Sequence, residues 1–285
     1  MGQARLRALL PLAAALLTAC AGVANTREVL DEKKALDEAP PPMATDAPVA
    51  MKELRAAADA GDAKAMTKLG VWYASGYGVP SDLDAALRWY QLAASKGERR
   101  AMHNMAMMYQ SGVGVPRDYD KARQLYEQAA ALGEPWSMSN LGYLHENGLG
   151  VPANPLEALH WYHKAAEAGD LFAMDNVGNM WFAGRGVTQD PAEAARWYAR
   201  AAQAGFPRSM ASLAGLYHSG KGVARDDREA YAWAMLALER ARSKAERDKY
   251  LPLASRAAQE LDAKGLQQAK LLRSELDRKV PRLSE

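Results

Sequence analysis

Residues 61–97 read GDAKAMTKLGVWYASGYGVPSDLDAALRWYQLAASKG, and the same pattern returns every 36 residues along the chain. Three sets of glycines keep this spacing without a gap. They are Gly61, Gly97, Gly133, Gly169 and Gly205; Gly76, Gly112, Gly148, Gly184 and Gly220; and Gly78, Gly114, Gly150, Gly186 and Gly222. A period of this length is typical of repeat proteins, in which each unit buries its apolar face by stacking on its neighbours.

Each period predicts two helices. In the first, Met66, Leu69, Gly70 and Tyr73 fall at i, i+3, i+4 and i+7, which places them on one face of a helix that ends at Gly76. The second helix starts after a polar residue that is favourable as an N-cap. These predicted N-caps are Asp82, Asp118, Asn154, Asp190 and Asp226, and three of them have a glutamate at the capping-box spacing, Glu157, Glu193 and Glu229. Its buried face is expected to combine large aromatic residues with alanines, as in Ala86, Trp89, Tyr90, Ala93 and Ala94.

The pattern A-M-x-x-L-G-x-x-Y-x-x-G-x-G-V-x-x-D-x-x-x-A-x-x-W-Y-x-x-A-A-x-x-G resembles the Sel1-like repeat, a relative of the tetratricopeptide repeat (TPR). The resemblance covers Gly61–Arg240 in five copies. It implies an all-α fold, a right-handed α/α superhelical solenoid of helix-turn-helix repeats. It also implies a function in protein–protein contacts, in which the first helix of each repeat lines the binding face.

We expect the chain to have four parts. Residues 1–19 are predicted to be a lipoprotein signal peptide, and residues 20–49 a lipidated cysteine followed by a disordered, Pro-rich tether. Residues 50–242 are predicted to form the repeat solenoid, with an N-terminal capping helix over Met51–Ala60. Residues 243–285 are predicted to form C-terminal capping helices over Lys244–Lys264 and Gly265–Lys279.

The signal-peptide prediction rests on Arg5 and Arg7 followed by an apolar run from residue 8 to residue 17. A helix of that length covers about 15 Å, half of the ~30 Å hydrocarbon core, so it is too short to span a membrane. The run ends in Leu17-Thr18-Ala19-Cys20, which resembles the bacterial lipobox and predicts lipidation of Cys20. An ordinary secretory signal followed by a chance cysteine is the alternative. Ala21 after the cysteine implies the outer membrane, with the folded part in the periplasm.

Composition and charge exclude several classes of function. Without Arg5 and Arg7 the chain has 34 basic and 34 acidic residues, so it lacks the positive charge that dominates nucleic-acid binding. Cys20 is the only cysteine, which leaves no thiol for a disulfide, a zinc site or a nucleophile. We expect no cofactor, no metal ion and no small-molecule substrate.

Three motifs suggest chemistry, but each has a simpler explanation. The Gly-x-Gly-Val segments follow a helix, so they indicate a helix end and not a phosphate-binding loop. His160 and His163 are three residues apart on one helix, but no third metal ligand is evident. His103, Ser139 and Asp175 occupy one position in successive repeats, too far apart for a catalytic triad. We therefore expect no enzymatic activity.

The candidate binding residues are positions of the first helices that are not predicted to face the core. They are Lys64, Lys68, Arg100, Asn104, Trp136, Asn140, Tyr143, Phe172, Asn176 and Arg208. The three asparagines form a ladder of amides able to bind an extended backbone, and the three aromatic residues resemble interface anchors. The alternative is that the asparagines bond between repeats and that Trp136 packs on a neighbour.

These residues predict a membrane-tethered periplasmic adaptor that holds a protein or peptide in the groove of the solenoid. Among the exposed positions of the first helices, Lys64, Lys68, Arg100 and Arg208 oppose only Asp175, so we expect an acidic partner. The alternative is an envelope protein that binds peptidoglycan or another glycan by stacking sugars on Trp136 and Tyr143.

Overall fold

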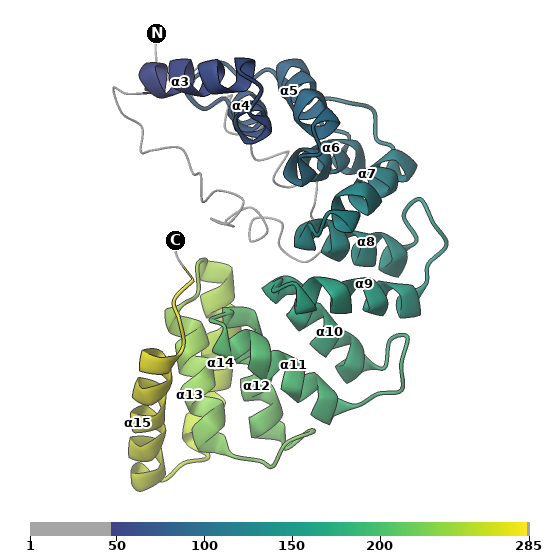
Figure 1. The fold of residues 1–285 in the computed structure, drawn as a ribbon. Helices are drawn as coiled ribbons and strands as arrows, with labels where there is room; N and C mark the ends of the chain where they lie inside the picture. The colour runs from purple at the N-terminus through teal and green to yellow at the C-terminus, as the bar shows by residue number, and fades with distance from the viewer. Residues whose placement is uncertain (1–46, 284–285) are drawn as a thin grey trace. The chain divides into compact units, whose positions relative to one another are not determined.

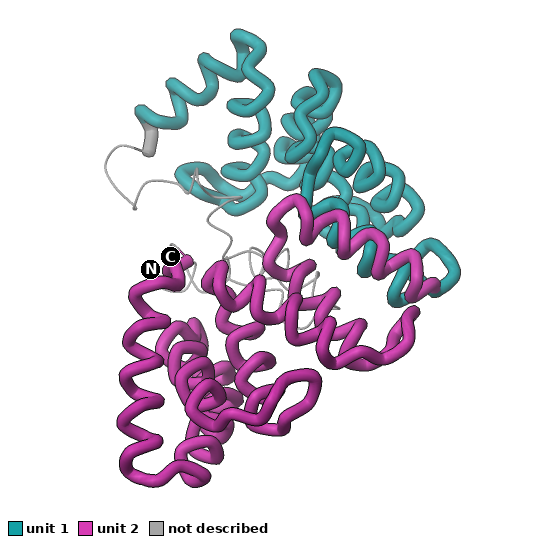
Figure 2. The backbone as a smooth tube through the Cα atoms, turned by 60° about the horizontal axis from the view of Figure 1, so that its bottom comes forward, with its two compact units in different colours: residues 1–153, 285 teal, residues 154–284 magenta. Residues whose placement is uncertain are grey.

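The computed structural model describes residues 47–283, and the regular elements of this range are thirteen α-helices, α3 to α15, joined by short turns (Figure 1). Residues 47–153 form one compact unit and residues 154–283 a second one, here called unit 1 and unit 2 (Figure 2). The predicted all-α fold of helix-turn-helix pairs is confirmed. The predicted signal peptide, Cys20 and the first part of the predicted tether lie outside the described residues.

Unit 1 holds an N-terminal helix and the first two and a half repeats. Its helices are α3 (Ala47–Asp59), α4 (Ala63–Ser75), α5 (Leu83–Ser95), α6 (Arg99–Ser111), α7 (Tyr119–Ala131) and α8 (Pro135–Asn147). Helix α3 begins four residues before the predicted capping helix, within the segment expected to be tether. The second residue of α3 is Pro48, and proline is tolerated in the first turn of a helix because the N–H it lacks has no helical partner there.

Unit 2 holds the rest of the repeats and the C-terminal helices. Its helices are α9 (Pro155–Glu167), α10 (Leu171–Ala183), α11 (Pro191–Gln203), α12 (Pro207–Ser219), α13 (Asp227–Glu239), α14 (Lys244–Gln259) and α15 (Ala263–Lys279). The predicted break between the last two helices was placed at residues 264–265, whereas the structure has it at residues 260–262. In that break Asp262 caps α15 by accepting a hydrogen bond from the Gly265 backbone N–H at 2.6 Å.

The predicted N-caps of the second helices are confirmed, but the predicted capping boxes are not. The carboxylate of Asp190 accepts the backbone N–H of Glu193 at 3.0 Å, as a cap should. The N–H of Asp190 itself donates to the carbonyl of Trp181 in the preceding helix at 2.9 Å. Asp226 does the same with Tyr217 at 3.1 Å. In a capping box the glutamate side chain would accept the backbone N–H of the cap residue. At these two caps that N–H already donates to the first helix of the repeat, so the glutamate bond does not form.

The second glycine of each loop lets consecutive repeats approach closely. Gly222 has φ +73°, and a Cβ atom at this position would lie 2.2 Å from the backbone carbonyl of Pro191, the first residue of α11. Likewise, a Cβ atom at Gly186 would lie 2.7 Å from the carbonyl carbon of Pro155 in α9. The loop of one repeat therefore rests directly on the N-terminus of the second helix of the previous repeat, and only glycine fits.

A tyrosine of the second helix fills a notch at the glycine in the middle of the first helix. A Cβ atom at Gly70 would lie 2.4 Å from the ring of Tyr90, and one at Gly178 would lie 2.7 Å from the ring of Tyr198. Both tyrosine side chains are buried. This contact explains why the repeat pairs a large aromatic residue with a residue that has no side chain.

The core of unit 1 differs from the predicted buried faces at several positions, and Trp89 and Ala94 of the second helix are only half-buried. Met66, Leu69 and Tyr90 are buried as predicted, but Trp72 is also buried, with 2 % of its surface exposed, and Tyr73 is only half-buried. The Tyr73 hydroxyl accepts a hydrogen bond from Arg55 at 3.2 Å. The polar end of the tyrosine therefore stays at the surface while the indole fills the core.

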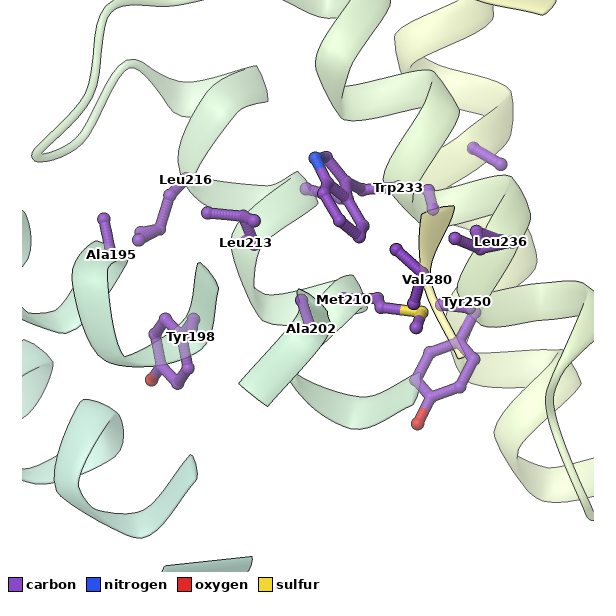
Figure 3. Packing of buried hydrophobic residues seen from close by; sticks show 14 of the residues in the cluster. Ala195, Tyr198, Ala202, Met210, Leu213, Leu216, Trp233, Leu236, Tyr250 and Val280 are labelled. Carbon is purple, nitrogen blue, oxygen red and sulfur yellow. The ribbon is translucent and has the colours of Figure 1, made fainter. Parts of the chain in front are cut away.

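In unit 2 the core continues into the C-terminal helices. Met210, Trp233, Tyr250 and Val280 belong to one buried cluster, to which α12, α13, α14 and the chain after α15 each contribute a residue (Figure 3). Helix α14 takes the place of the first helix of a further repeat, since it begins 37 residues after the start of α12 and packs against α13. Helix α15 packs mainly against α13, so the repeat pattern ends there.

Candidate functional site

In unit 1 the candidate site lies on the first helices, α4, α6 and α8. Arg100 and Trp136 occupy the same position of consecutive repeats, and both are half-buried. The Arg100 guanidinium carbon lies 5.8 Å from the centre of the Trp136 ring, within the range of a cation–π contact. The two predicted residues are therefore brought together as one surface, which offers a cation and an aromatic ring side by side.

His103 is buried beneath this surface and packs against Trp136. It is 5 % exposed, its Nδ1 lies 3.0 Å from the hydroxyl of Ser137, and its ring centre is 6.0 Å from that of Trp136. Burial, followed by the nearby Arg100 charge, lowers the pKa of His103 to about 3. The imidazole therefore remains neutral near pH 7 and holds Trp136 in place without adding charge to the site.

The predicted amide ladder is largely engaged in contacts within the chain. Asn104 hydrogen-bonds the hydroxyl of Tyr90, a residue of the previous repeat, so the alternative of a bond between repeats holds at this position. The side chain of Asn140 donates to the carbonyl of Trp136 in its own helix at 2.9 Å. Asn140 thereby fixes the backbone beside the candidate anchor. Asn176 is half-buried on α10 in unit 2.

The prediction that Tyr143 is an exposed anchor is wrong. Its side chain is buried, with 9 % of its surface exposed, and its carbonyl accepts a hydrogen bond from Asn147 at 2.9 Å. The helical wheel places this residue at the border of the buried face, and the packing of α8 draws it inside. The proposed sugar-stacking pair consequently loses one of its two aromatic residues.

In unit 2 the equivalent position holds Phe172 and Arg208. Phe172 is half-buried and packs edge-on against Phe206, with ring centres 4.8 Å apart. Arg208 Nε donates to the carboxylate of Asp175 at 2.8 Å, and Asp175 is only 1 % exposed. Phe172 thus packs on a neighbouring residue of its unit, and the charge of the half-buried Arg208 is neutralised by the buried Asp175.

Asp175 is the centre of a buried network that the sequence did not reveal. Besides Arg208, its carboxylate accepts hydrogen bonds from Ser209 at 2.6 Å and from Asn179 at 2.9 Å. Asn179 in turn accepts the hydroxyl of Tyr198 at 2.7 Å. The count of positive charge on the first helices already subtracts Asp175, so this pair leaves the expected surplus unchanged and confines it to Lys64, Lys68 and Arg100.

The serines that complete these contacts carried a weak signal in the sequence. Ser137 and Ser209 stand where other repeats have Ala65, Ala101 and Ala173, and each lies 34 residues after its polar partner. A polar residue in a row of buried alanines indicates a partner within reach. His103 and Asp175 thus bond two different serines, and neither of these is Ser139, the serine of the triad that the sequence superficially suggested.

Neither a metal centre nor a membrane span is found in residues 47–283. These residues hold no group of three or more His, Cys, Asp or Glu side chains arranged to bind a metal ion. A depression of about 480 Å³ on α9 is lined by Leu156, Glu157, Leu159, His160, His163 and Lys164. Every helix of this part of the chain is too short or too polar to cross a bilayer.

Comparison with known families assigns the chain to one of them. The Sel1 repeat profile matches residues 63–98, 99–134, 137–170, 171–206 and 207–240, more than half of the chain. The chain belongs to the Sel1 repeat family. No curated protein matches it.

Solved structures of Sel1 repeat proteins resemble the chain. A Sel1 repeat protein from Oxalobacter formigenes is 28% identical, with a TM-score of 0.65 over 79% of this chain and 99% of that one. A Sel1 repeat protein from Klebsiella pneumoniae is 21% identical over 73% and 99% of the two chains, with a TM-score of 0.46. An immunity protein from Pseudomonas aeruginosa is 22% identical over 78% and 84%, with a TM-score of 0.47. The first supports the repeat fold, and the other two carry no further argument.

Proposed function

We propose that this Sel1 repeat protein is a non-enzymatic adaptor that binds a protein or peptide partner through the first helices of unit 1. The observation that carries the proposal is the pairing of Arg100 with Trp136. Tryptophan and arginine are the residues most enriched at the centres of protein interfaces. Here the two are half-buried next to each other and are supported by a buried, neutral His103. A surface that is already held in place loses little conformational entropy when it binds.

The partner is proposed to be acidic, with the charge attraction centred on α4 and α6. Lys64 is exposed at the start of α4, and Arg100 lies at the start of α6. Neither residue forms an ion pair with a carboxylate of residues 47–283. Fixed positive charge of this kind raises the association rate of an acidic partner and orients the partner on the surface.

We also propose that the protein is attached through a lipidated Cys20 to the outer membrane and that its repeats face the periplasm. The sequence up to residue 20 supports this proposal, because its basic, apolar and small-residue parts occur in the order of a lipoprotein signal. Several acyl chains give stable attachment where a single chain is marginal.

A comparison of two binding reactions tests the adaptor proposal against glycan binding. The purified protein is incubated with peptidoglycan sacculi or with detergent-solubilised envelope proteins, together with Trp136→Ala and the outer-face control Gln128→Ala. The proposal predicts a discrete protein that is retained by the wild type and by the control but lost with Trp136→Ala. Retention on sacculi alone, with the same dependence on Trp136, would support the glycan alternative and contradict the adaptor.

A further inference from the structure

Successive first helices meet in a fixed register, in which one residue opposes the residues 33 and 34 positions later. In unit 2, Asp175 of α10 contacts Arg208 at 2.8 Å and Ser209 at 2.6 Å. In unit 1, His103 of α6 faces Trp136 with ring centres 6.0 Å apart and contacts Ser137 at 3.0 Å. Two pairs of helices with unrelated side chains thus show the same geometry.

This register places Thr67 of α4 opposite Arg100 of α6, at the position that Asp175 occupies opposite Arg208. Thr67 is buried, and its hydroxyl donates to the carbonyl of Ala63 one turn earlier at 2.9 Å. It therefore offers no negative charge to Arg100. The residue after Arg100 is Ala101, so the second donor that Asp175 receives from Ser209 is also missing.

The carboxylates near Arg100 are committed to other groups. Glu98 accepts the backbone N–H of Arg100 at 3.2 Å and so caps α6. Glu134 is 2 % exposed and forms its ion pair with Arg99 at 3.2 Å; the charge of Arg100 also acts on Glu134, but without an ion pair between them. Within residues 47–283 the Arg100 guanidinium has no ion-pair partner, although it is half-buried and held over Trp136.

We propose that Arg100 is a socket for one carboxylate of the partner, which there plays the part that Asp175 plays for Arg208. The inference rests on the proposed function and narrows it to a single interaction. Guanidinium and carboxylate form charge-assisted hydrogen bonds that are stronger than neutral ones. The adjacent indole ring favours an apolar or aromatic neighbour of the acidic group. The carboxylate comes either from an Asp or Glu side chain or from the C-terminus of a peptide.

Defined peptides and isotope-labelled protein test the socket. The indole N–H signal of Trp136, assigned with Trp136→Phe, is followed while one of three peptides is added: acetyl-tetraglutamate amide, acetyl-tetraglutamine with a free C-terminus, or acetyl-tetraglutamine amide. A shift with the first indicates side-chain recognition, and a shift with the second alone indicates recognition of the C-terminus. The third carries no carboxylate and should cause no shift. The proposal is wrong if neither carboxylate peptide shifts the signal, or if the third shifts it equally.

Two variants decide whether the carboxylate binds where the register places it. Thr67→Asp supplies the missing negative charge within the chain and should weaken binding of the active peptide at least tenfold. Arg100→Gln should have the same effect without adding a buried charge, which keeps the test valid if Thr67→Asp does not fold. Arg88→Gln on the exposed side of α5 is the matched control and should bind as the wild type does. Unchanged binding by Arg100→Gln, or by a folded Thr67→Asp, would overturn the socket.

The outcomes for the socket and for the adaptor are independent. Peptide binding at Arg100 without any protein partner in the envelope would leave the socket standing and contradict the adaptor. If instead a protein partner binds only when Trp136 is present and neither carboxylate peptide binds, the adaptor would stand and the socket would be contradicted.

Discussion

At the residue scale, one position of the first helix shows how the repeats of this protein have diverged in chemistry. The position holds Lys64, Arg100, Trp136, Phe172 and Arg208 in order along the chain. Both arginines are half-buried, but Arg208 forms an ion pair with a carboxylate of the neighbouring helix, whereas the register places Thr67, which has no charge, opposite Arg100. What a side chain does here is decided by the residue 33 positions earlier as much as by the side chain itself.

His103 should make the stability of the protein depend on pH. Its pKa is about 3 in the folded protein and about 6.5 in an unfolded chain, so between these values only the unfolded state binds the proton. The free energy of unfolding should therefore fall as the pH falls below 6.5, by about 1.4 kcal/mol per pH unit from this group. Urea unfolding between pH 7 and pH 5 measures the effect. The variant His103→Asn should show a shallower decline, and an identical decline would contradict the assignment.

The notch at Gly178 should tolerate no branched side chain. Gly178→Val brings new atoms against the ring of Tyr198, and we expect a loss of about 2–4 kcal/mol by overpacking and strain. Gly215→Ala is the control, because a Cβ atom there meets nothing within 4 Å. That change should be neutral or stabilise by about 0.5–1 kcal/mol through helix propensity. Thermal melting separates the two, and similar melting temperatures for wild type and Gly178→Val would contradict the tight contact.

At the element scale, the loops do as much as the helices to set the repeat. Each first helix ends at a glycine with positive φ, such as Gly184 at +68°, and the next glycine lies against the preceding repeat. The backbone N–H of each aspartate N-cap of the second helices, such as Asp190, bonds back to the first helix. Backbone groups therefore fix the angle between the two helices before any side chain contributes.

At Gly222, the contribution of the close contact to stability can be measured separately from that of the left-handed backbone conformation. Both Gly222 and Gly97 have positive φ, but a Cβ atom at Gly97 meets nothing within 4 Å, whereas one at Gly222 meets the carbonyl of Pro191. Gly97→Ala should lose roughly 1–2 kcal/mol from the backbone conformation alone. Gly222→Ala should lose about 1–3 kcal/mol more because the loop must move. Chemical unfolding measures both, and equal losses would show that the loop contact carries no energy.

At the scale of the whole molecule, the sequence predicted the fold well because the deciding features are local. Glycine spacing, N-caps and the alanine-aromatic stripe depend on residues within one repeat, and the caps at Asp82 and Asp190 have the predicted side-chain bonds. The predicted capping boxes at Asp190 and Asp226 are wrong because the backbone N–H of each cap already donates to the carbonyl of the residue nine positions earlier. Sequence spacing alone does not predict which of two acceptors a backbone N–H will bond.

The candidate site was predicted only in part, for a related reason. Arg100 and Trp136 lie together as expected, but the burial of Tyr143 and the pairing of Arg208 depend on how two helices meet. A helical wheel gives the direction of a side chain on its own helix and not the residue it faces. The register of 33 and 34 positions, once known from Asp175 and His103, supplies the missing information.

The proposed membrane attachment is tested at this scale by one substitution. Cys20→Ser removes the thiol that the lipidation reaction requires, so the protein should move from the membrane fraction to the soluble periplasmic fraction. Fractionation followed by immunodetection measures this. Ser81→Ala, a change within the repeats, is the control and should leave the distribution unaltered. Membrane fractionation that is unchanged in Cys20→Ser would contradict the anchor.

Crosslinking from position 140 in living cells tests the central claim most directly. A photoreactive residue replacing Asn140 lies one turn from Trp136 on α8, and one replacing the exposed Gln128 on α7 serves as the control. We predict a discrete protein adduct from position 140, its loss when Trp136→Ala or Arg100→Gln is added, and no such adduct from position 128. Adducts that are the same from both positions, or that persist in both variants, would contradict an adaptor that binds through the first helices of unit 1.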